Sequence, residues 1–295
     1  MPNIAFVNGK WMPLAAARVS VEDRGFQFGD GVYELIRVYG GQPFHLRAHL
    51  ARLAESVRQI GIASAHSMEQ LERIALAGCR RSGYRSAKIY IQITRGVAAR
   101  IHHFPMQVKP TLVMTFRRLT PIAPEVRARG VSAMTSVDHR WDHCNIKSLN
   151  LLPNVMAREE AIRAGHAETL FIREGLVTEG AGSNVFAVIG GTVVTPPEGA
   201  AVLSGITREV VISVGRKRGI EVTESDIPLD QLRGADEIFL TGTTIEVLPV
   251  VWLDGKKVAN GRPGPITKQL YTAFLEEIAI KNPTSSPPSQ RGENP

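Results

Sequence analysis

One lysine in the sequence has neighbours that suit amine chemistry. Lys147 lies in RWDHCNIKSLNLLP, next to Ile146 and close to Leu149. Apolar neighbours that exclude water lower the pKa of a lysine and supply the neutral amine that a Schiff base requires. Most lysines are solvated surface charges. The segment alone therefore leaves both interpretations open.

Three further polar groups follow predicted strands or precede a predicted helix. Glu179 follows a strand in LVTEGAGSNVF, and taken alone it is only a carboxylate in a turn. The segment SGIT at 204–207 leads into a helix, whose free N–H groups and positive dipole end bind anions. The alternative is a plain N-cap by Ser204. TGTT at 241–244 is either a phosphate-binding turn or a simple polar turn.

The first part of the chain predicts strands joined by tight turns, together with two helices. IAFVNGKWM predicts a hairpin at Asn-Gly, because both turn positions tolerate positive φ. GVYELIRVYGGQPF, AKIYIQITRG and PTLVMTFRRL predict further strands. Apolar residues from Leu46 to Ile60 recur at helical spacing, and Ser67 with Gln70 forms a capping-box pattern for a second helix.

The second part predicts a larger, strand-rich unit. The segment 120–130 is rich in Pro and charge and is the expected domain boundary. Hairpins are predicted in ETLFIREGLVTEG, NVFAVIGGTVVTPP and VLPVVWLDGKKV, and helices in PNVMAREEAIRAG and ITREVVISVGRKRG. Short hairpin turns favour mixed or antiparallel sheets. We expect an α/β (α+β) fold with domains at 1–120 and 121–282, and a disordered Pro/Ser-rich tail at 283–295.

Composition excludes several classes of protein. The formal charge is +7, but basic residues alternate with acidic ones, so a solvated surface is favoured over a nucleic-acid site. Two cysteines in unrelated segments cannot form a disulfide framework, and no Cys/His spacing indicates a metal site. No signal peptide or membrane span is apparent, and no GxGxxG or Walker motif follows a strand. We therefore expect a cytoplasmic protein that binds neither nucleic acid nor membrane.

Taken together, the motifs resemble those of the fold-type IV pyridoxal phosphate (PLP) enzymes. Within that family they are most similar to bacterial D-amino acid aminotransferases. The resemblance covers residues 3–280. It is carried by EDRGFQFGDGVYE at 22–34, TRG followed by Arg100 and His102, IKSLNLLPN at 146–154, TEGAGSNVF at 178–186, SGITR at 204–208 and TGTT at 241–244.

The resemblance implies a role for each of these groups. Lys147 would carry PLP as a Schiff base and move the substrate proton, and Glu179 would bind the protonated pyridine nitrogen. Leu203 would contact the ring, with Arg140 behind Glu179. The phosphate would be bound by Arg52, Ile206, Thr207 and Thr243. Glu34 and His49 would support Lys147 and Arg52. The expected fold has a small N-terminal α+β domain and a larger C-terminal mixed-sheet pseudo-barrel.

The resemblance also implies the substrate. Tyr33, Arg100 and His102 match residues that bind the substrate α-carboxylate in the D-amino acid enzymes. We expect a ping-pong transamination of D-alanine with 2-oxoglutarate by a homodimer, in which a loop of the partner subunit lies near the substrate. The partners are then small molecules, namely amino acids and 2-oxo acids.

Two departures and three alternatives accompany this expectation. Ala181 and Gly182, and also Gly242, stand where the D-amino acid enzymes carry serines, which puts a hydroxyl relay and one phosphate contact in doubt. A branched-chain L-amino acid aminotransferase and an aminodeoxychorismate lyase share the fold. Arg100 and His102 are then only residues of a surface loop. A basic, non-enzymatic binding protein is the alternative from another class.

Overall fold

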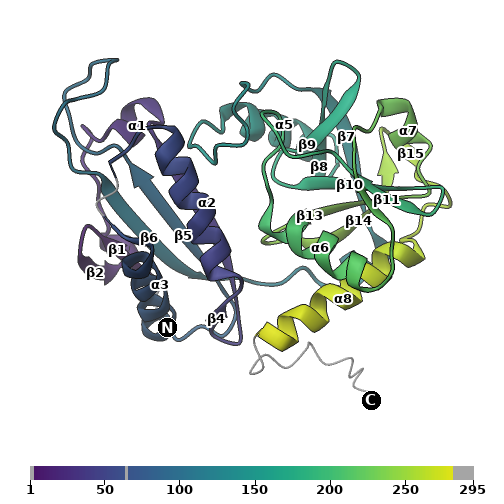
Figure 1. The fold of residues 1–295 in the computed structure, drawn as a ribbon, viewed down its shortest axis with the longest axis horizontal. Helices are drawn as coiled ribbons and strands as arrows, with labels where there is room; N and C mark the ends of the chain where they lie inside the picture. The colour runs from purple at the N-terminus through teal and green to yellow at the C-terminus, as the bar shows by residue number, and fades with distance from the viewer. Residues whose placement is uncertain (1–2, 64–65, 282–295) are drawn as a thin grey trace.

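The fold is known from a computed structural model that describes residues 3–63 and 66–281. The tail at 283–295, expected to be disordered, lies outside the described residues. Two sheets lie side by side along the long axis of the molecule (Figure 1). The first is six-stranded and antiparallel in the order β2-β1-β6-β5-β3-β4. Its strands are β1 (Ile4–Val7), β2 (Lys10–Pro13), β3 (Gly31–Tyr39), β4 (Gln42–Pro43), β5 (Ala87–Thr94) and β6 (Thr111–Arg118).

Local sequence explains the turns and helix ends of this first sheet. The β1–β2 hairpin turns at Asn8 and Gly9, whose φ values are 44° and 93°, as its Asn-Gly sequence predicts. The predicted capping box is confirmed, because Ser67 and Gln70 exchange side-chain to backbone hydrogen bonds at the start of α3. The helices are α1 (Arg24–Phe28), α2 (Leu46–Gln59) and α3 (Met68–Ser82), with a 3-10 turn at Leu14–Ala16.

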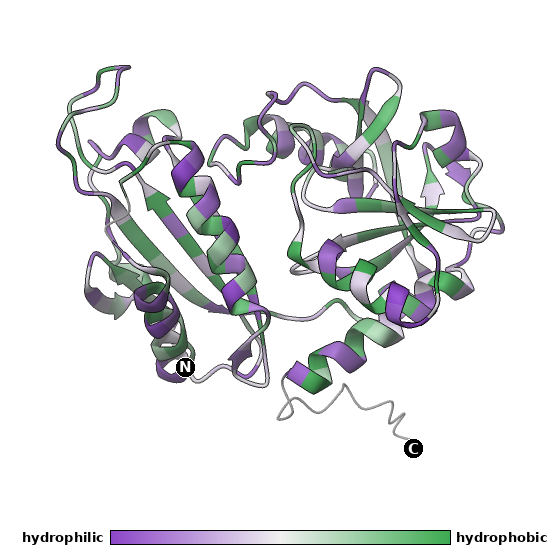
Figure 2. Cartoon of the chain, viewed as in Figure 1, coloured by the Kyte–Doolittle hydropathy of each residue, from purple (hydrophilic) through white to green (hydrophobic). Residues whose placement is uncertain are grey.

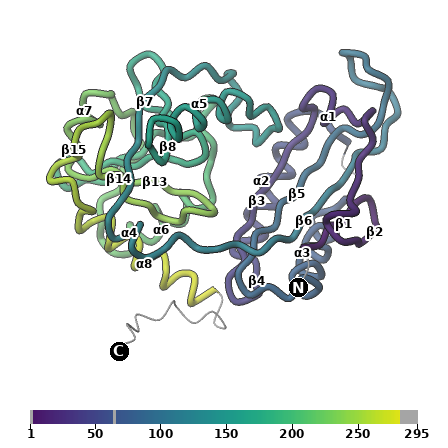
Figure 3. Tube along the Cα trace, turned by 180° about the vertical axis from the view of Figure 1, so that it is seen from behind, coloured from purple at the N-terminus to yellow at the C-terminus, as the bar shows by residue number. Residues whose placement is uncertain are grey.

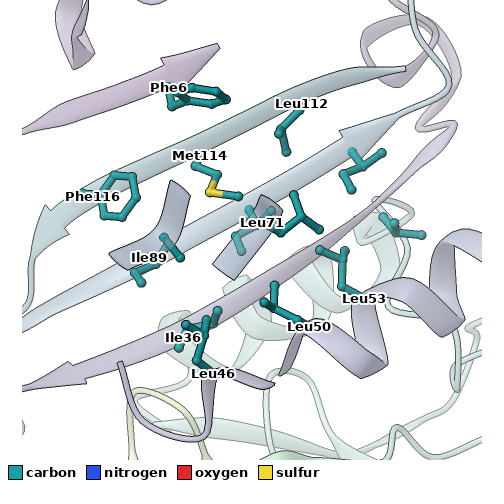
Figure 4. Close-up of a cluster of buried hydrophobic side chains, with 14 of the residues drawn as sticks. Phe6, Ile36, Leu46, Leu50, Leu53, Leu71, Ile89, Leu112, Met114 and Phe116 are labelled. Atoms are coloured by element: carbon teal, nitrogen blue, oxygen red, sulfur yellow. The ribbon is translucent and has the colours of Figure 1, made fainter. Parts of the chain in front are cut away.

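The six-stranded sheet and its helices form the first half of the molecule. Its core lies between the sheet and two helices on one face of the sheet. Leu50 and Leu53 of α2 are fully buried and point toward the strands (Figure 4). Burial of each such side chain contributes about 2 kcal/mol. Viewed from behind, β3, β5 and β6 lie in front of both helices, so α2 and α3 share one face of the sheet (Figure 3). The opposite face has no helix of the described chain on it.

The second sheet is mixed and strongly curved. Its order is β12-β11-β10-β13-β14-β7-β8-β9, with β15 beside β14. Strands β12 and β11, β14 and β7, and β7 and β8 pair in parallel. β9 lies at one end of this order yet also contacts β10, so the sheet bends into a half-barrel. The expected α+β fold with a mixed second sheet is therefore confirmed.

Short connections and, within the described residues, five helices complete the second half. Hydrophobic residues run along the central strands of both sheets (Figure 2). The strands are β7 (Val131–Val137), β8 (Glu168–Arg173), β9 (Leu176–Gly180), β10 (Asn184–Ile189), β11 (Thr192–Thr195), β12 (Val222–Glu224), β13 (Glu237–Gly242), β14 (Glu246–Leu253) and β15 (Lys256–Lys257). The helices are α4 (Pro124–Arg129), α5 (Leu152–Arg163), α6 (Ile206–Lys217), α7 (Leu229–Arg233) and α8 (Pro265–Lys281).

The two halves also contact each other outside the segment that links them. The segment 119–130 runs between β6 and β7 and includes α4, where the sequence suggested only a boundary. Phe44, which precedes α2, belongs to the second core and contacts Phe274 of α8, with 5.7 Å between ring centroids. Among the described residues, no helix is long and apolar enough to cross a membrane.

Candidate functional site

A cavity of about 500 Å³ lies between the two halves, and Lys147 lines it. Lys147 stands on the segment before α5, but its backbone is bonded to the first half. Its N–H donates to Ser56 Oγ at 3.3 Å, and its carbonyl accepts from Tyr33 N at 2.9 Å. The amine Nζ lies 4.5 Å from the centroid of the Tyr33 ring. This aromatic contact directs the amine into the cavity.

Glu179 lines the same cavity from the second half, at the end of β9. Its carboxylate accepts hydrogen bonds from Arg140 Nη1, from Asn184 Nδ2 at 3.2 Å and from Leu203 N at 3.0 Å. Burial raises the pKa of Glu179, while the positive charges of Arg140 and Lys147 act in the opposite direction. Three donors directed at one carboxylate favour its ionised form.

Arg140 lies behind Glu179, as the resemblance implies. Its Nε and Nη2 donate to the two carboxylate oxygens of Asp138, at 2.9 and 2.8 Å. The hydrogen bonds and charge of Arg140 outweigh burial and lower the pKa of Asp138. Asp138 and Asn184 were not predicted from the sequence. Two features of the sequence could have indicated them. Asp138 lies two residues before Arg140 at the end of a strand, and Asn184 follows the Gly-rich turn.

The start of α6, which also lines the cavity, has the donors of an anion site. Gly205 is the N-cap of α6, and no side chain among the described residues caps this helix, so the alternative of a plain N-cap by Ser204 is not observed. The first-turn N–H groups of Ile206 and Thr207 are therefore free of a side-chain cap. A Cβ at position 205 would lie 2.0 Å from Asn184 Oδ1, which leaves room only for glycine. Because the positive end of the helix dipole adds to these donors, an anion is favoured here.

Hydroxyl groups and a guanidinium surround this helix start. Thr207 and Thr243 line the cavity together with Arg52 and Leu203. Thr241 also lines it, and its Oγ1 is buried without a hydrogen-bond partner among the described residues. Buried hydroxyls are normally satisfied. An orphaned hydroxyl beside a free helix start fits a site that receives an oxyanion.

Arg52 is oriented by a fully buried carboxylate. Its Nε and Nη2 donate to Glu34 at 2.6 and 2.9 Å, and its Nη1 donates to Ser204 O at 2.6 Å. His49 Nδ1 lies 2.7 Å from the same carboxylate. Burial would raise the pKa of Glu34, but Arg52 and His49 outweigh it and lower the pKa to about 2. Burial lowers the pKa of His49. Glu34 therefore binds both Arg52 and His49, and no hydrogen bond among the described residues joins Glu34 or His49 to Lys147.

The low pKa of Glu34 makes its contribution to stability dependent on pH. Its ordinary value is 4.5 and its folded value is about 2, so the stabilisation is complete above pH 4.5 and is lost as the pH falls toward 2. We expect Glu34→Gln to lower the free energy of unfolding by roughly 3 kcal/mol at neutral pH. The difference from wild type should shrink between pH 4.5 and 2, measured by urea unfolding at a series of pH values.

A matched control is available on α2. Glu55 pairs with Arg58 through an exposed carboxylate, where water screens the charge. Glu55→Gln should change the unfolding free energy little at every pH. An equal loss in both variants, or a loss in Glu34→Gln that does not vary with pH, would contradict the assigned role of Glu34.

The predicted carboxylate-binding residues do not all meet in this chain. Tyr33 lines the cavity, but Arg100 and His102 do not. Both lie on the exposed connection 95–110 between β5 and β6, which extends past α1 at the outer end of the first sheet (Figure 1). There both contact the ring of Phe28. Within one subunit, therefore, the cavity has only one of the three predicted groups.

The three positions at which the D-amino acid enzymes carry serines also line the cavity. Ala181, Gly182 and Gly242 contribute to its wall without a hydroxyl. No serine hydroxyl is bonded to Glu179 among the described residues. The amide of Asn184 and the guanidinium of Arg140 bind the carboxylate instead. The departure noted in the sequence thus leaves the environment of Glu179 fully hydrogen-bonded.

The residues of the cavity fit the group that the resemblance implies. An amine, a buried carboxylate and a helix start with hydroxyls line one space of about 500 Å³. These are the partners of an aldehyde, a pyridine nitrogen and a phosphate, respectively. The orphaned hydroxyl of Thr241 and the uncapped start of α6 are left unsatisfied by the described chain itself.

Comparison with known proteins supports the same assignment. The profile of the class IV amino-transferase family matches residues 31–252. A protein named D-alanine aminotransferase from Bacillus licheniformis is 42% identical over 276 residues, which cover 92% of this chain and 95% of the relative. A D-alanine aminotransferase from Listeria monocytogenes is 39% identical over 92% of this chain and 95% of the relative.

Solved structures of similar proteins share the whole fold. The branched-chain amino acid aminotransferase of Escherichia coli superposes with a TM-score of 0.87 at 30% identity, covering 94% of both chains. Another branched-chain amino acid aminotransferase, solved with pyridoxamine 5′-phosphate, also gives a TM-score of 0.87, at 29% identity over 96% of both chains.

Proposed function

The chain belongs to the class IV aminotransferases, which use PLP, and from this membership we propose that it transfers amino groups from D-amino acids to 2-oxo acids. D-alanine and 2-oxoglutarate are the proposed pair, giving pyruvate and D-glutamate in two half-reactions. One observation carries the chemistry: Lys147, Glu179 and the start of α6 line a single cavity. The relatives named D-alanine aminotransferase support the choice of the D series.

Each residue of the cavity has a separate proposed role. PLP, when bound, supplies an electron sink that stabilises negative charge at Cα of the amino acid. Lys147 Nζ, held against the Tyr33 ring, removes and returns the proton at Cα. Glu179 would bind the pyridine nitrogen, and its negative charge would keep that nitrogen protonated. Leu203, whose N–H donates to Glu179, would contact the ring.

The phosphate is assigned to the start of α6. We propose that it is bound by Arg52, the hydroxyls of Thr207 and Thr243, and the backbone of Ile206. The uncapped start of α6 supports this assignment, because a dianion satisfies the free N–H groups there. Glu34 orients the guanidinium of Arg52 toward Ser204 and the same helix start.

We propose that the working unit is a homodimer with the domains 1–120 and 121–282 in each subunit. Arg100 and His102 would bind the substrate carboxylate in the cavity of the partner, next to the partner's Tyr33. Their position outside the cavity of their own subunit supports this arrangement. So does the face of the first sheet that carries no helix (Figure 3). Light scattering after size-exclusion chromatography measures the number of subunits.

We also propose a cytoplasmic location. Both cysteines, Cys79 and Cys144, are free and buried, as is usual for proteins of reducing compartments.

D-alanine and L-leucine distinguish the two candidate amino donors. The alternative, a branched-chain L-amino acid aminotransferase, is favoured by the solved structures at a TM-score of 0.87. We expect kcat/KM for D-alanine to exceed that for L-leucine by at least about 100-fold, because the bound carboxylate sets which face of Cα meets Lys147. Coupled assays of pyruvate and of the branched 2-oxo acid measure both values. A preference for L-leucine would overturn the proposal. Repeated turnover of aminodeoxychorismate to pyruvate without any 2-oxo acceptor would indicate a lyase.

A further inference from the structure

The connection 95–110, which carries Arg100 and His102, is bonded at its base to the segment 22–30. An isolated β-bridge joins Asp23 and Val97. Three backbone hydrogen bonds connect the two segments: Arg24 N to Gly96 O at 2.9 Å, Ala98 N to Glu22 O at 3.2 Å and Arg95 N to Asp30 O at 3.0 Å. The exposed connection therefore begins in a fixed direction.

Arg24 binds the connection 95–110 between the two proposed carboxylate-binding residues. It is 2% exposed, and its Nε donates to Asp30 Oδ2 at 2.7 Å. Its Nη1 donates to the carbonyl of Ile101 at 2.6 Å. Ile101 stands between Arg100 and His102. A short, charge-assisted hydrogen bond thus fixes the main chain between the two proposed carboxylate-binding residues.

The ring of Phe28 holds their side chains. The Arg100 guanidinium carbon lies 4.9 Å from the ring centroid, and the His102 ring centroid lies 5.7 Å from it. Arg24 contacts the same ring at 4.7 Å. Cation–π contacts of this kind orient a guanidinium without occupying its N–H donors. Those donors remain available for a carboxylate.

A second buried arginine stabilises the base of this arrangement. Arg95 is 4% exposed and donates to Asp30 Oδ2 at 2.8 Å, so two guanidinium groups share one carboxylate oxygen. It also donates to the carbonyls of Gly61 and Ile60 after α2, at 2.9 and 2.7 Å. Its guanidinium carbon lies 3.5 Å from the Phe104 ring centroid, farther along the connection. Asp30 is therefore the common partner that joins α1, α2 and the connection.

We propose that Arg24 and Phe28 are positioning residues for the substrate carboxylate, because they fix Arg100 and His102 in a geometry that suits the cavity of the partner subunit. This inference rests on the proposed function of Arg100 and His102. The α-carboxylate is common to amino donors and 2-oxo acceptors, so these residues act on KM for both. PLP binding is independent of them, since neither residue lines the cavity.

Phe28→Leu and Arg24→Met test the inference in the PLP-loaded enzyme. We expect Phe28→Leu to raise KM for D-alanine and for 2-oxoglutarate about three- to ten-fold, with kcat changed less than two-fold. Arg24→Met should act in the same direction. The inhibition constant of propionate, a carboxylate without an amine, should rise in parallel. Phe26→Leu is the matched control, because Phe26 lies on the same helix and is 73% exposed; it should leave these constants unchanged.

Arg100→Met separates this inference from the proposed function. If Arg100→Met leaves KM for D-alanine unchanged, the proposed carboxylate site fails. If Arg100→Met raises KM while Phe28→Leu matches Phe26→Leu, only the positioning role fails. In the Arg100→Met background, Phe28→Leu should lose most of its effect on KM, because the two residues act through one contact. If the effects of Arg100→Met and Phe28→Leu on KM were additive, the inference would be overturned. This comparison does not require Arg24→Met to fold.

Discussion

Lys147→Ala is expected to remove the visible absorbance that PLP gains on attachment to the protein, and to lower kcat by about 10⁴-fold. Lys147 provides the amine of the cavity, and its backbone is fixed by Tyr33 and Ser56. A neighbouring lysine cannot replace it, since Lys147 is the only lysine that lines the cavity among the described residues. The absorbance spectrum of the purified protein and a stopped assay of pyruvate release measure both effects.

The control for this prediction is a lysine away from the cavity. Lys268 is exposed on α8, and Lys268→Ala should keep both the absorbance and kcat. The melting temperature of Lys147→Ala reports whether the fold persists. Persistence of the visible band in a folded Lys147→Ala protein would refute the assignment of the cofactor-binding lysine.

Glu179→Gln should lower kcat by about 10²- to 10³-fold while PLP remains bound. The neutral amide keeps the shape of the carboxylate but no longer holds a negative charge against the pyridine nitrogen. Lys147 and the start of α6 are untouched, so the stoichiometry of PLP should stay at one per subunit. Arg140 keeps both hydrogen bonds to Asp138, which limits the loss of stability. Steady-state kinetics together with PLP quantification measure the two quantities.

Glu160→Gln serves as the control, because Glu160 is an exposed residue of α5. It should not change kcat. If Glu179→Gln kept kcat within two-fold of wild type, Glu179 would be only a structural partner of Arg140, and the electron sink would need another source of negative charge in the cavity.

Much of the fold was predictable from local sequence. The Asn8-Gly9 turn, the Ser67 capping box and the apolar stripe of α2 each follow from interactions within about four residues. Four of the described helices, α1, α4, α7 and α8, were not predicted. In α8 the buried positions Leu270, Phe274 and Ile278 recur at helical spacing, a signal that was present but not used. In α1 five residues are too few to show a period, and the helix depends on Asp23 as its N-cap.

Most of the site was also predictable, but only through the motifs as a set. Lys147, Glu179 and Thr243 come from separate segments, and no spacing within one of them indicates that they share a cavity. Contacts across long sequence separations were not predictable. Asp30, for example, binds Arg95 and so depends on the pairing of β3 with β5. The direction of the connection 95–110 likewise depends on the segment 22–30.

The backbone bonds of Lys147 have a mechanical consequence. Lys147 follows β7 along the chain, yet it is joined to Tyr33 and Ser56 of the first half, whereas Glu179 belongs to β9 of the second. A hinge movement between the halves therefore carries the amine and the carboxylate in opposite directions. The distance between the Lys147 amine and the Glu179 carboxylate depends on how the two halves pack against each other. The distant contact of Phe44 with Phe274 is part of this packing. The reactivity of the groups in this cavity thus depends on how the two halves pack against each other, and neither half determines it alone.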